Sequence, residues 1–214
     1  MFVLSQHPSI ASHFLAGLRD TSLQRHPSLF RQNLLHLGQI LAYEISKTFQ
    51  YSPQETPTPL GVKQTDQIQN QLVLATILRA GLPFHQGFLA YWEHAENAFI
   101  GAYRGKHQAG EAFEIVQRYI TSPDLDGKTL VLTDPMLATG KSIVTVYEAL
   151  LQYGKPAVLH VAAVIGSQAG VDYVRKHLPT AQLWIGDIDP ELNTSSYIVP
   201  GLGDAGDLAF GEKL

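Results

Sequence analysis

A single acidic residue followed by a loop of small residues has the clearest chemistry in this sequence. The segment is Asp134-Pro135-Met136-Leu137-Ala138-Thr139-Gly140-Lys141-Ser142, between an apolar run and an amphipathic stretch. Small residues leave backbone N–H groups uncovered at the start of the following helix, where the helix dipole stabilises an anion. A carboxylate there would repel a triphosphate but can accept hydrogen bonds from neighbouring sugar hydroxyls. The pattern therefore favours a sugar phosphate as the ligand.

Two other interpretations of this loop need to be weighed. Asp134 capping a turn and Gly140 starting a helix would be a purely structural arrangement, and the loop alone leaves it open. The run Gly140-Lys141-Ser142 also resembles the end of a Walker A loop, which has an earlier glycine five residues before Gly140. Pro135 stands at that position and has no amide donor, so the phosphate cradle of a nucleotide kinase would be incomplete.

Two arginines, Arg79 and Arg104, follow other strand-like runs. A guanidinium is always charged and can bind two phosphate oxygens at once, so it suits a leaving diphosphate. Each arginine alone is more often a surface ion-pair partner. Their shared position at strand ends favours a second anionic group near the first loop.

The C-terminal segment from Tyr197 to Gly211 is rich in glycine and also contains apolar side chains. It cannot form a regular helix or central strand, so its backbone is either a functional surface or a loop packed over the sheet. Bare backbone at Gly203 and Ala205 can read the edge of a flat base. Asp204 would then lie close to the sugar or to the departing diphosphate.

Alternating strands and helices position these segments. Apolar runs predict strands at 71–78, 97–103, 128–133, 158–165 and 182–188, and helical spacing predicts helices at 82–91, 139–153 and 170–177. This alternation predicts an α/β fold with a parallel sheet and ligand loops at its carboxyl edge.

The remaining segments are expected to lie around that sheet. We expect a helix at 27–49 that belongs to an N-terminal cap rather than to the sheet. The prolines of residues 51–59 predict a break in regular structure, followed by a polar turn or short hairpin at 65–70. The alternating residues 112–120 predict a β-arm.

Composition limits the function classes. The chain has 214 residues, 45% of them hydrophobic, and a formal charge of −4, which argues against general nucleic-acid binding. It has no cysteines, which is typical of a cytoplasmic protein and excludes thiolate metal sites. We expect neither a signal peptide nor a membrane span. The nine histidines show no metal-ligand spacing, so no protein-bound metal is predicted.

Taken together, these stretches resemble the uracil phosphoribosyltransferase family. The matching motifs keep the family's order and approximate spacing: Ile77-Leu78-Arg79-Ala80-Gly81-Leu82, Tyr103-Arg104, Asp134-Pro135-Met136-Leu137-Ala138-Thr139-Gly140, and Tyr197-Ile198-Val199-Pro200-Gly201-Leu202-Gly203-Asp204-Ala205-Gly206-Asp207. The resemblance extends from the N-terminal helix to Gly211, and the aspartate loop and the C-terminal motif are highly specific to the family.

The resemblance implies the type I phosphoribosyltransferase fold, with a parallel five-stranded core flanked by helices and a hood built from the chain ends. It implies a single domain, with an N-terminal part at about 1–70, a core at about 71–188 and a uracil-binding hood at about 189–214. The implied reaction converts uracil and 5-phosphoribosyl 1-diphosphate into UMP and diphosphate in pyrimidine salvage. A homodimer or higher homo-oligomer is expected, without nucleic-acid or membrane partners.

The family's residue roles carry over by position. Asp134 to Ser142 would bind the ribose 5-phosphate part of the donor, with Asp134 on the ribose hydroxyls and as a catalytic group. Arg79 and Arg104 would bind the diphosphate, and Mg²⁺ would arrive chelated by it. Uracil would contact Ile198, Gly203, Asp204 and Ala205, and Asp204 would also touch the donor. Asp204 or a water would accept the proton of uracil N1.

The chain departs from the family pattern at a few places. Lys141 stands where glycine is usual, Thr76 replaces a proline, Glu212 replaces a common threonine, and residues 166–170 replace a Pro-Glu-Gly turn. An alternative is a regulatory protein that keeps the fold and senses nucleotides. Such proteins have two adjacent acids where this chain has Asp134-Pro135, and they need a basic face that the net charge does not indicate.

Overall fold

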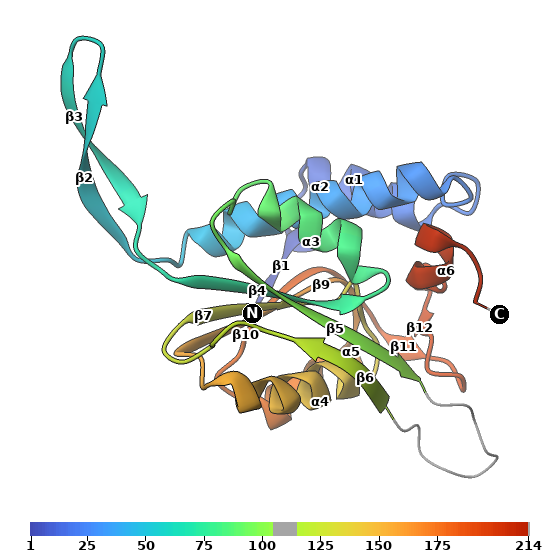
Figure 1. Ribbon diagram of the computed structural model, residues 1–214. Helices are drawn as coiled ribbons and strands as arrows, with labels where there is room; N and C mark the ends of the chain where they lie inside the picture. Colours follow the sequence, from blue (N-terminus) through green and yellow to red (C-terminus); the bar gives the residue numbers. More distant parts are fainter. Residues whose placement is uncertain (105–114, 214) are drawn as a thin grey trace.

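A mostly parallel sheet between two helical layers carries the loops with predicted chemistry (Figure 1). The structure, a computed structural model, describes residues 1–104 and 115–213, without the side chains of residues 102–118. Five neighbouring strands run parallel, in the order β10-β9-β7-β4-β5. They are β4 (Leu72–Leu78), β5 (Glu96–Arg104), β7 (Thr129–Thr133), β9 (Val158–Ser167) and β10 (Gln182–Asp189). This confirms the predicted α/β fold with a five-stranded parallel core.

Three further strands extend this sheet. The short β1 (Phe2–Val3) pairs in parallel with β10, and β8 (Met136–Leu137) pairs in parallel with β9. At the other edge, β6 (Ile115–Thr121) runs antiparallel to β5. The predicted extended conformation of residues 112–120, outside the parallel core, is confirmed for the described part, but this part is an edge strand of the sheet and not a separate β-arm; residues 112–114 lie outside the described residues.

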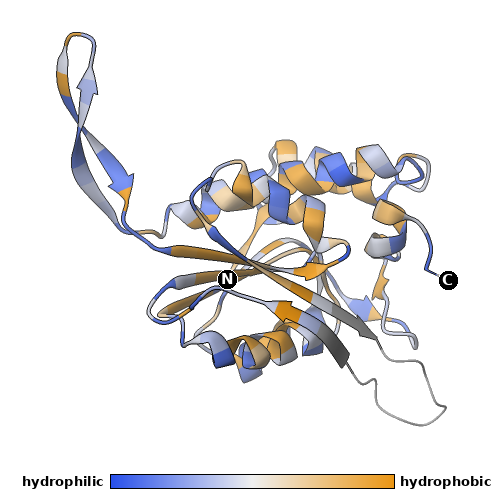
Figure 2. Cartoon of the chain, in the orientation of Figure 1, coloured by the Kyte–Doolittle hydropathy of each residue, from blue (hydrophilic) through white to orange (hydrophobic). Residues whose placement is uncertain are grey.

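Helices cover both faces of the sheet, which explains why its central strands are continuously apolar. On one face lie α1 (Ile10–Arg19), α2 (Pro27–Ser46) and α3 (Gly81–Leu89), and on the other α4 (Lys141–Leu150) and α5 (Gln168–His177) (Figure 1). Short 3₁₀ turns occur at Leu4–Gln6 and Leu151–Tyr153. Figure 2 shows the apolar residues gathered on the central strands and on the helix faces toward them.

The expectation that residues 27–49 form a cap apart from the sheet is wrong. Leu34, Leu37 and Leu41 of α2 are fully buried, in one apolar cluster with Val131 of β7 and Val164 of β9. A helix with such a stripe is stabilised by covering the sheet face, so α2 belongs to the central layer.

The predicted break at 51–59 is also wrong, because this segment forms one strand of a long hairpin. β2 (Tyr51–Thr58) and β3 (Gly61–Ile68) pair antiparallel and project away from the sheet (Figure 1). Proline lacks a donor and is excluded from central strands, but in a two-stranded ribbon each strand has a free edge that accommodates it. Pro53 and Pro57 are therefore compatible with the pairing of β2 and β3.

The chain ends after the sheet in a small C-terminal unit. β11 (Glu191–Leu192) and β12 (Ile198–Val199) pair antiparallel, and α6 (Ala205–Phe210) follows. The expectation that the glycine-rich C-terminal segment forms no regular helix is therefore wrong for α6, which the Asp204 side chain caps. Arg31 of α2 donates to the carbonyl of Ala209 at 2.6 Å, and its guanidinium lies 5.8 Å from the Phe210 ring centroid. These contacts hold α6 against the N-terminal helices. Among the described residues, no helix combines the length and apolarity needed to cross a bilayer.

Two buried histidines predict acid-sensitive stability. His85 of α3 and His160 of β9 are 1% and 2% exposed, and burial lowers the pKa of each to about 4. Unfolding restores a value near 6.5, so below that pH the unfolded chain binds more protons and the folded state loses stability until pH about 4. We expect each histidine to lower the free energy of unfolding by roughly 1.4 kcal/mol per pH unit in this window.

Urea unfolding at pH 7, 6 and 5 measures this loss. A His85→Phe variant should show a shallower decline than the unchanged chain, because one of the two proton-binding groups is gone. An equal slope in both proteins would contradict the assignment of His85.

Candidate active site

A cavity of about 590 Å³ lies where the carboxyl ends of β4 and β7 meet the C-terminal unit. Three of the four predicted segments contribute to its wall. The lining residues are Ile77, Leu78, Arg79 and Ala80 after β4; Asp134, Met136 and Ala138 after β7; and Ser196, Tyr197, Ile198, Gly203, Asp204, Ala205, Gly206 and Lys213. The carboxyl-edge rule therefore placed Arg79 and the Asp134 loop correctly relative to one another.

Asp134 is held by the backbone of the sheet and of its own loop. Its N–H donates to Ala162 of β9 at 3.1 Å, and its Oδ1 accepts from the N–H of Met136 at 3.2 Å. The carbonyl of Pro135 then accepts from the N–H groups of Val164 and Ile165 at 3.1 and 2.9 Å. The loop thus follows β9 before α4 begins, which presents Asp134 to the cavity.

The rest of this loop leads into α4. Gly140 has φ +74° at the N-terminus of α4, a conformation that favours glycine, and an added Cβ would lie 2.7 Å from the carbonyl oxygen of Gly170. Pro135, Leu137, Thr139, Gly140, Lys141 and Ser142 are not among the lining residues of the cavity. From this loop, Asp134, Met136 and Ala138 line the cavity, and the start of α4 follows three residues after Ala138.

The loop is also fastened to α5. Ser167, which is fully buried, donates to the carbonyl of Ala138 at 2.6 Å and caps α5 by accepting from the N–H of Gly170 at 2.9 Å. A Cβ on Gly170 would lie 2.3 Å from the Ala138 oxygen, so the contact needs glycine there. Within the segment 166–170, which departs from the family turn, Ser167 thus both caps α5 and positions the loop.

We expect Ser167→Ala to lose about 1–2 kcal/mol of stability, because a helix cap and a buried hydrogen bond are removed together. The Michaelis constant for a ligand of the Asp134 loop should rise, while that for a ligand of the C-terminal unit should not. Steady-state kinetics with each ligand varied in turn measures this. Ser9→Ala, which removes the cap at the N-terminus of α1 and does not alter a lining residue of the cavity, is the control. Equal kinetic effects of the two variants would contradict a role for Ser167 in the loop.

Arg79 extends from the end of β4 to the C-terminal unit. Its Nη2 lies 2.7 Å from Oδ1 of Asp207, and its Nη1 donates to the carbonyl of Gly211 at 3.2 Å. The guanidinium lines the cavity and is 39% exposed, so it is accessible to an anionic ligand. Arg104 is the last residue of β5, beside β4 in the sheet. Its side chain lies outside the described residues, so its meeting with Arg79 stays a prediction.

The predicted base-binding residues are brought together in the C-terminal unit. Ile198 and Ala205 are 4% and 3% exposed, and Gly203 has φ +93°. Asp204 caps α6, its Oδ1 accepting from the N–H groups of Gly206 and Asp207 at 2.8 and 3.0 Å. The short helix thus fixes the direction of the backbone that faces the cavity.

Asp204 is kept ionised by its partners. Burial alone would raise the pKa of its carboxyl, but the N–H of Asp207, Lys213 and the N–H of Gly206 outweigh it, so the pKa lies below its usual value. The Lys213 ammonium is 3.2 Å from Oδ2 of Asp204. A carboxylate held in this way is a weak base.

Several residues of this site were given no role in the sequence analysis, although Tyr197 and Asp207 stand in the C-terminal motif. Asp207 and Lys213 share an ion-pair network with Arg79 and Asp204, and Ser196 and Tyr197 line the cavity. A signal existed for Asp207, which stands in the first turn of α6. Lys213 follows the last helix with no local pattern around it.

The arrangement offers three kinds of recognition in one cavity. Arg79 and Lys213 supply positive charge, Asp134 supplies a carboxylate for hydroxyl groups, and the backbone around Gly203 supplies groups for a flat base. In the described part of the chain, no group of three or more His, Asp or Glu side chains is placed to hold a metal ion.

Comparison with known proteins gives the family. The family model described as uracil phosphoribosyltransferase matches residues 4–212. Uracil phosphoribosyltransferase from Porphyromonas gingivalis is 48% identical over 212 residues, covering 99% of this chain and 98% of the relative. That from Pyrococcus furiosus is 38% identical, covering 86% of this chain and 80% of the relative.

Solved structures share the fold of this chain. The AQ2163 protein from Aquifex aeolicus superposes with a TM-score of 0.88 at 30% identity, covering 99% of this chain and 98% of the other. A hypoxanthine phosphoribosyltransferase from Staphylococcus aureus, at 14% identity and a TM-score of 0.50, covers 76% of each chain and shares the fold alone. With the family model matching nearly the whole length, the chain belongs to the uracil phosphoribosyltransferase family.

Proposed function

We propose that the chain transfers the phosphoribosyl group of 5-phosphoribosyl 1-diphosphate to uracil, giving UMP and diphosphate. Family membership supports the reaction. The observation that carries its assignment to this site is the cavity where Asp134, Arg79 and the backbone of Gly203 to Ala205 face a common space. These groups match, in order, the ribose hydroxyls, the leaving diphosphate and the base.

The donor would lie along the β7 side of the cavity. The Asp134-to-Ser142 loop and the start of α4 suit the 5-phosphate, because backbone N–H groups and the helix dipole favour an anion there. Asp134 would accept hydrogen bonds from the ribose hydroxyls. Arg79 and Arg104 would bind the diphosphate, with Asp204 nearby.

Uracil would lie against the C-terminal unit, over Ile198 and beside Gly203, Asp204 and Ala205. Backbone groups there can pair with the carbonyl oxygens and ring N–H of the base. Cytosine has an amine where uracil has O4, so it would leave a backbone donor unpaired. A polar group of the site that is left without a partner in this way can lower kcat/KM for the wrong base by roughly 10⁴-fold.

In the reaction, the bond from C1 of the ribose to diphosphate lengthens first and positive charge develops on the sugar. The Asp134 carboxylate stabilises that charge, while Arg79 stabilises the charge of the departing diphosphate. Uracil N1 then attacks C1 from the opposite face and loses its proton. Because Asp204 is a weak base in this structure, the geometry favours a water as the acceptor.

Mg²⁺ fits this site as an ion that would enter bound to the donor. Mg²⁺ prefers one or two carboxylates together with waters and substrate phosphate oxygens, and Asp134 and Asp204 are carboxylates that line the cavity. When bound with the diphosphate, the ion would neutralise part of the leaving charge.

We further propose that the chain forms a homo-oligomer through the β2–β3 hairpin. The hairpin is mostly hydrophilic with apolar residues at its tip, where Leu60 is 100% and Val62 is 65% exposed (Figure 2). An isolated two-stranded hairpin is only marginally stable in water, so a second copy is the expected support. Light scattering of the purified chain and of Leu60→Asp tests this; a monomeric unchanged chain would contradict it.

A steady-state assay with uracil, the phosphoribosyl donor and Mg²⁺ tests the function. We expect UMP and diphosphate in equal amounts. Purified, folded protein that forms no UMP would contradict the enzyme. RNA binding without turnover would support the regulatory alternative instead.

A further inference from the structure

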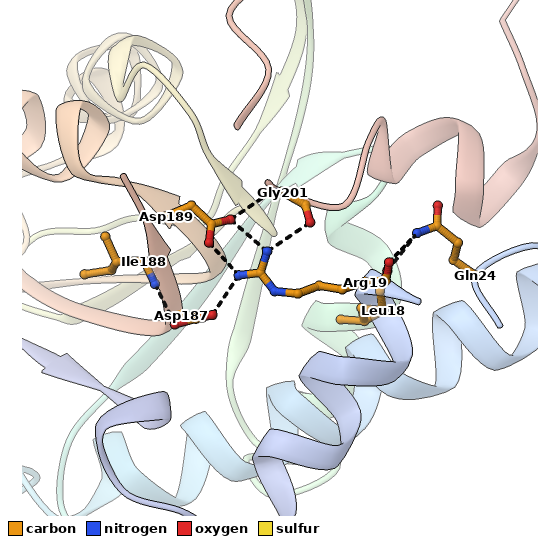
Figure 3. A network of polar contacts seen from close by, with 7 residues as sticks. All are labelled: Leu18, Arg19, Gln24, Asp187, Ile188, Asp189 and Gly201. Carbon is orange, nitrogen blue, oxygen red and sulfur yellow. Dashed lines mark hydrogen bonds and ion pairs between the residues drawn. The ribbon is translucent and has the colours of Figure 1, made fainter. Parts of the chain in front are cut away.

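A charged cluster outside the cavity holds the segment that would bind uracil (Figure 3). Arg19, the last residue of α1, forms a two-pronged ion pair with Asp189 at the end of β10, with Nη1–Oδ2 2.8 Å and Nη2–Oδ1 2.9 Å. Its Nη2 also lies 2.7 Å from Oδ2 of Asp187. Its Nη1 donates to the carbonyl of Gly201 at 2.9 Å. These partners are 168 to 182 residues away in sequence.

The cluster fixes both backbone groups of Gly201. While Arg19 binds the carbonyl, Oδ2 of Asp189 accepts from the Gly201 N–H at 3.0 Å. Gly201 has φ +59°, and an added Cβ would lie 2.1 Å from the carbonyl oxygen of Ile198. The turn is thus held by one guanidinium, one carboxylate and a conformation that needs glycine.

The cluster can affect uracil binding because of where the Gly201 turn lies in the chain. Gly201 lies between Ile198 and the Gly203-to-Ala205 backbone, the two parts of the proposed uracil site. Arg19, Asp187 and Asp189 are not lining residues of the cavity, whereas Ile198 and Gly203 are. The cluster therefore acts on the base site only through the turn.

The ion pair between Arg19 and Asp189 is largely shielded from water. The Asp189 side chain is 7% and the Arg19 side chain 21% exposed, so their interaction is weakly screened. A guanidinium fork matches a carboxylate in a way that a lysine ammonium does not, so this geometry is specific to arginine.

We propose that Arg19 is a positioning residue for uracil, acting with Asp189 to hold the Gly201 turn. This rests on the proposed function, because it concerns the base site of that reaction. In the proposed function the donor would lie mainly on the loops after β4 and β7, whereas the contacts of this cluster go to Gly201. Loss of the clamp should therefore affect the two substrates unequally.

The test is steady-state kinetics of Arg19→Lys in the full-length chain, with uracil and donor varied separately. We expect the Michaelis constant for uracil to rise about 10- to 100-fold, the cost of a small misplacement of binding groups, with that for the donor nearly unchanged. Asp189→Asn weakens the ion pair with Arg19 from its other side and should also raise the Michaelis constant for uracil alone. Asp187→Asn leaves the contacts of Gly201 in place and should not change the Michaelis constant for uracil in this way.

A stability control separates positioning from general loosening. Leu178→Ala, in the apolar cluster on the opposite face of the sheet, should lower the melting temperature without raising the Michaelis constant for uracil more than that for the donor. Two results with Arg19→Lys would overturn the proposal: equal changes in both Michaelis constants, or a loss of stability with neither constant changed. If Arg19→Lys does not fold, the same results with Asp189→Asn would overturn it. An unchanged chain that makes no UMP would instead overturn the proposed function.

Discussion

Asp134→Asn is expected to lower turnover by about 10²- to 10³-fold, the usual loss when one group that stabilises transition-state charge is removed. Asparagine keeps the shape of the side chain, and its Oδ1 can still accept from the N–H of Met136, so the loop should stay in place. What is lost is the negative charge that faces the developing positive charge of the ribose. The measurement is the turnover number at saturating uracil and donor, with circular dichroism to verify folding.

Lys141→Gly is the matched comparison within the same loop. Lys141 begins α4 and is not a lining residue of the cavity, so this variant should lose much less turnover. A larger loss in Lys141→Gly than in Asp134→Asn would mean that the roles in the loop are assigned wrongly.

Arg79→Gln is expected to raise the Michaelis constant for the phosphoribosyl donor by about 10- to 100-fold, since a hydrogen bond to a charged group contributes about 1.5–3 kcal/mol. Glutamine can still donate to the Gly211 carbonyl but has no charge for a diphosphate. Initial rates with the donor varied at saturating uracil measure the change. The Michaelis constant for uracil should change much less.

Asp207→Asn distinguishes binding of the donor from support of the C-terminal unit. Asp207 is the ionic partner of Arg79, so this variant breaks the ion pair but leaves the guanidinium available. We expect a much smaller effect on the donor than from Arg79→Gln. Equal effects would show that Arg79 acts only by holding α6.

Local sequence patterns were sufficient to predict the strands and helices of the parallel core. β7 is buried along its length, with Leu130, Val131 and Leu132 consecutive, because helices cover both faces. The glycine and small residues after it lead into α4 within a few positions. Each of these features depends on neighbours in sequence, so they are visible without the fold. The edge rule for parallel strands then brought Arg79 and Asp134 to one cavity.

The hairpin at 51–68 and the place of α2 could not be found in this way. Proline content argues against a strand in a sheet of many strands, but whether a strand has a free edge is decided by its partners. The apolar stripe of α2 predicts a buried face, but not the surface that buries it.

The sequence by itself determined the order of strands and helices, the aspartate loop and the C-terminal motif, because these depend on residue types at short spacing. Only the tertiary structure decided which charged groups meet. Arg19 with Asp189, Arg79 with Asp207 and Lys213 with Asp204 are joined by folding. An ion pair depends on distance in space, and neither partner leaves a periodic trace along the chain.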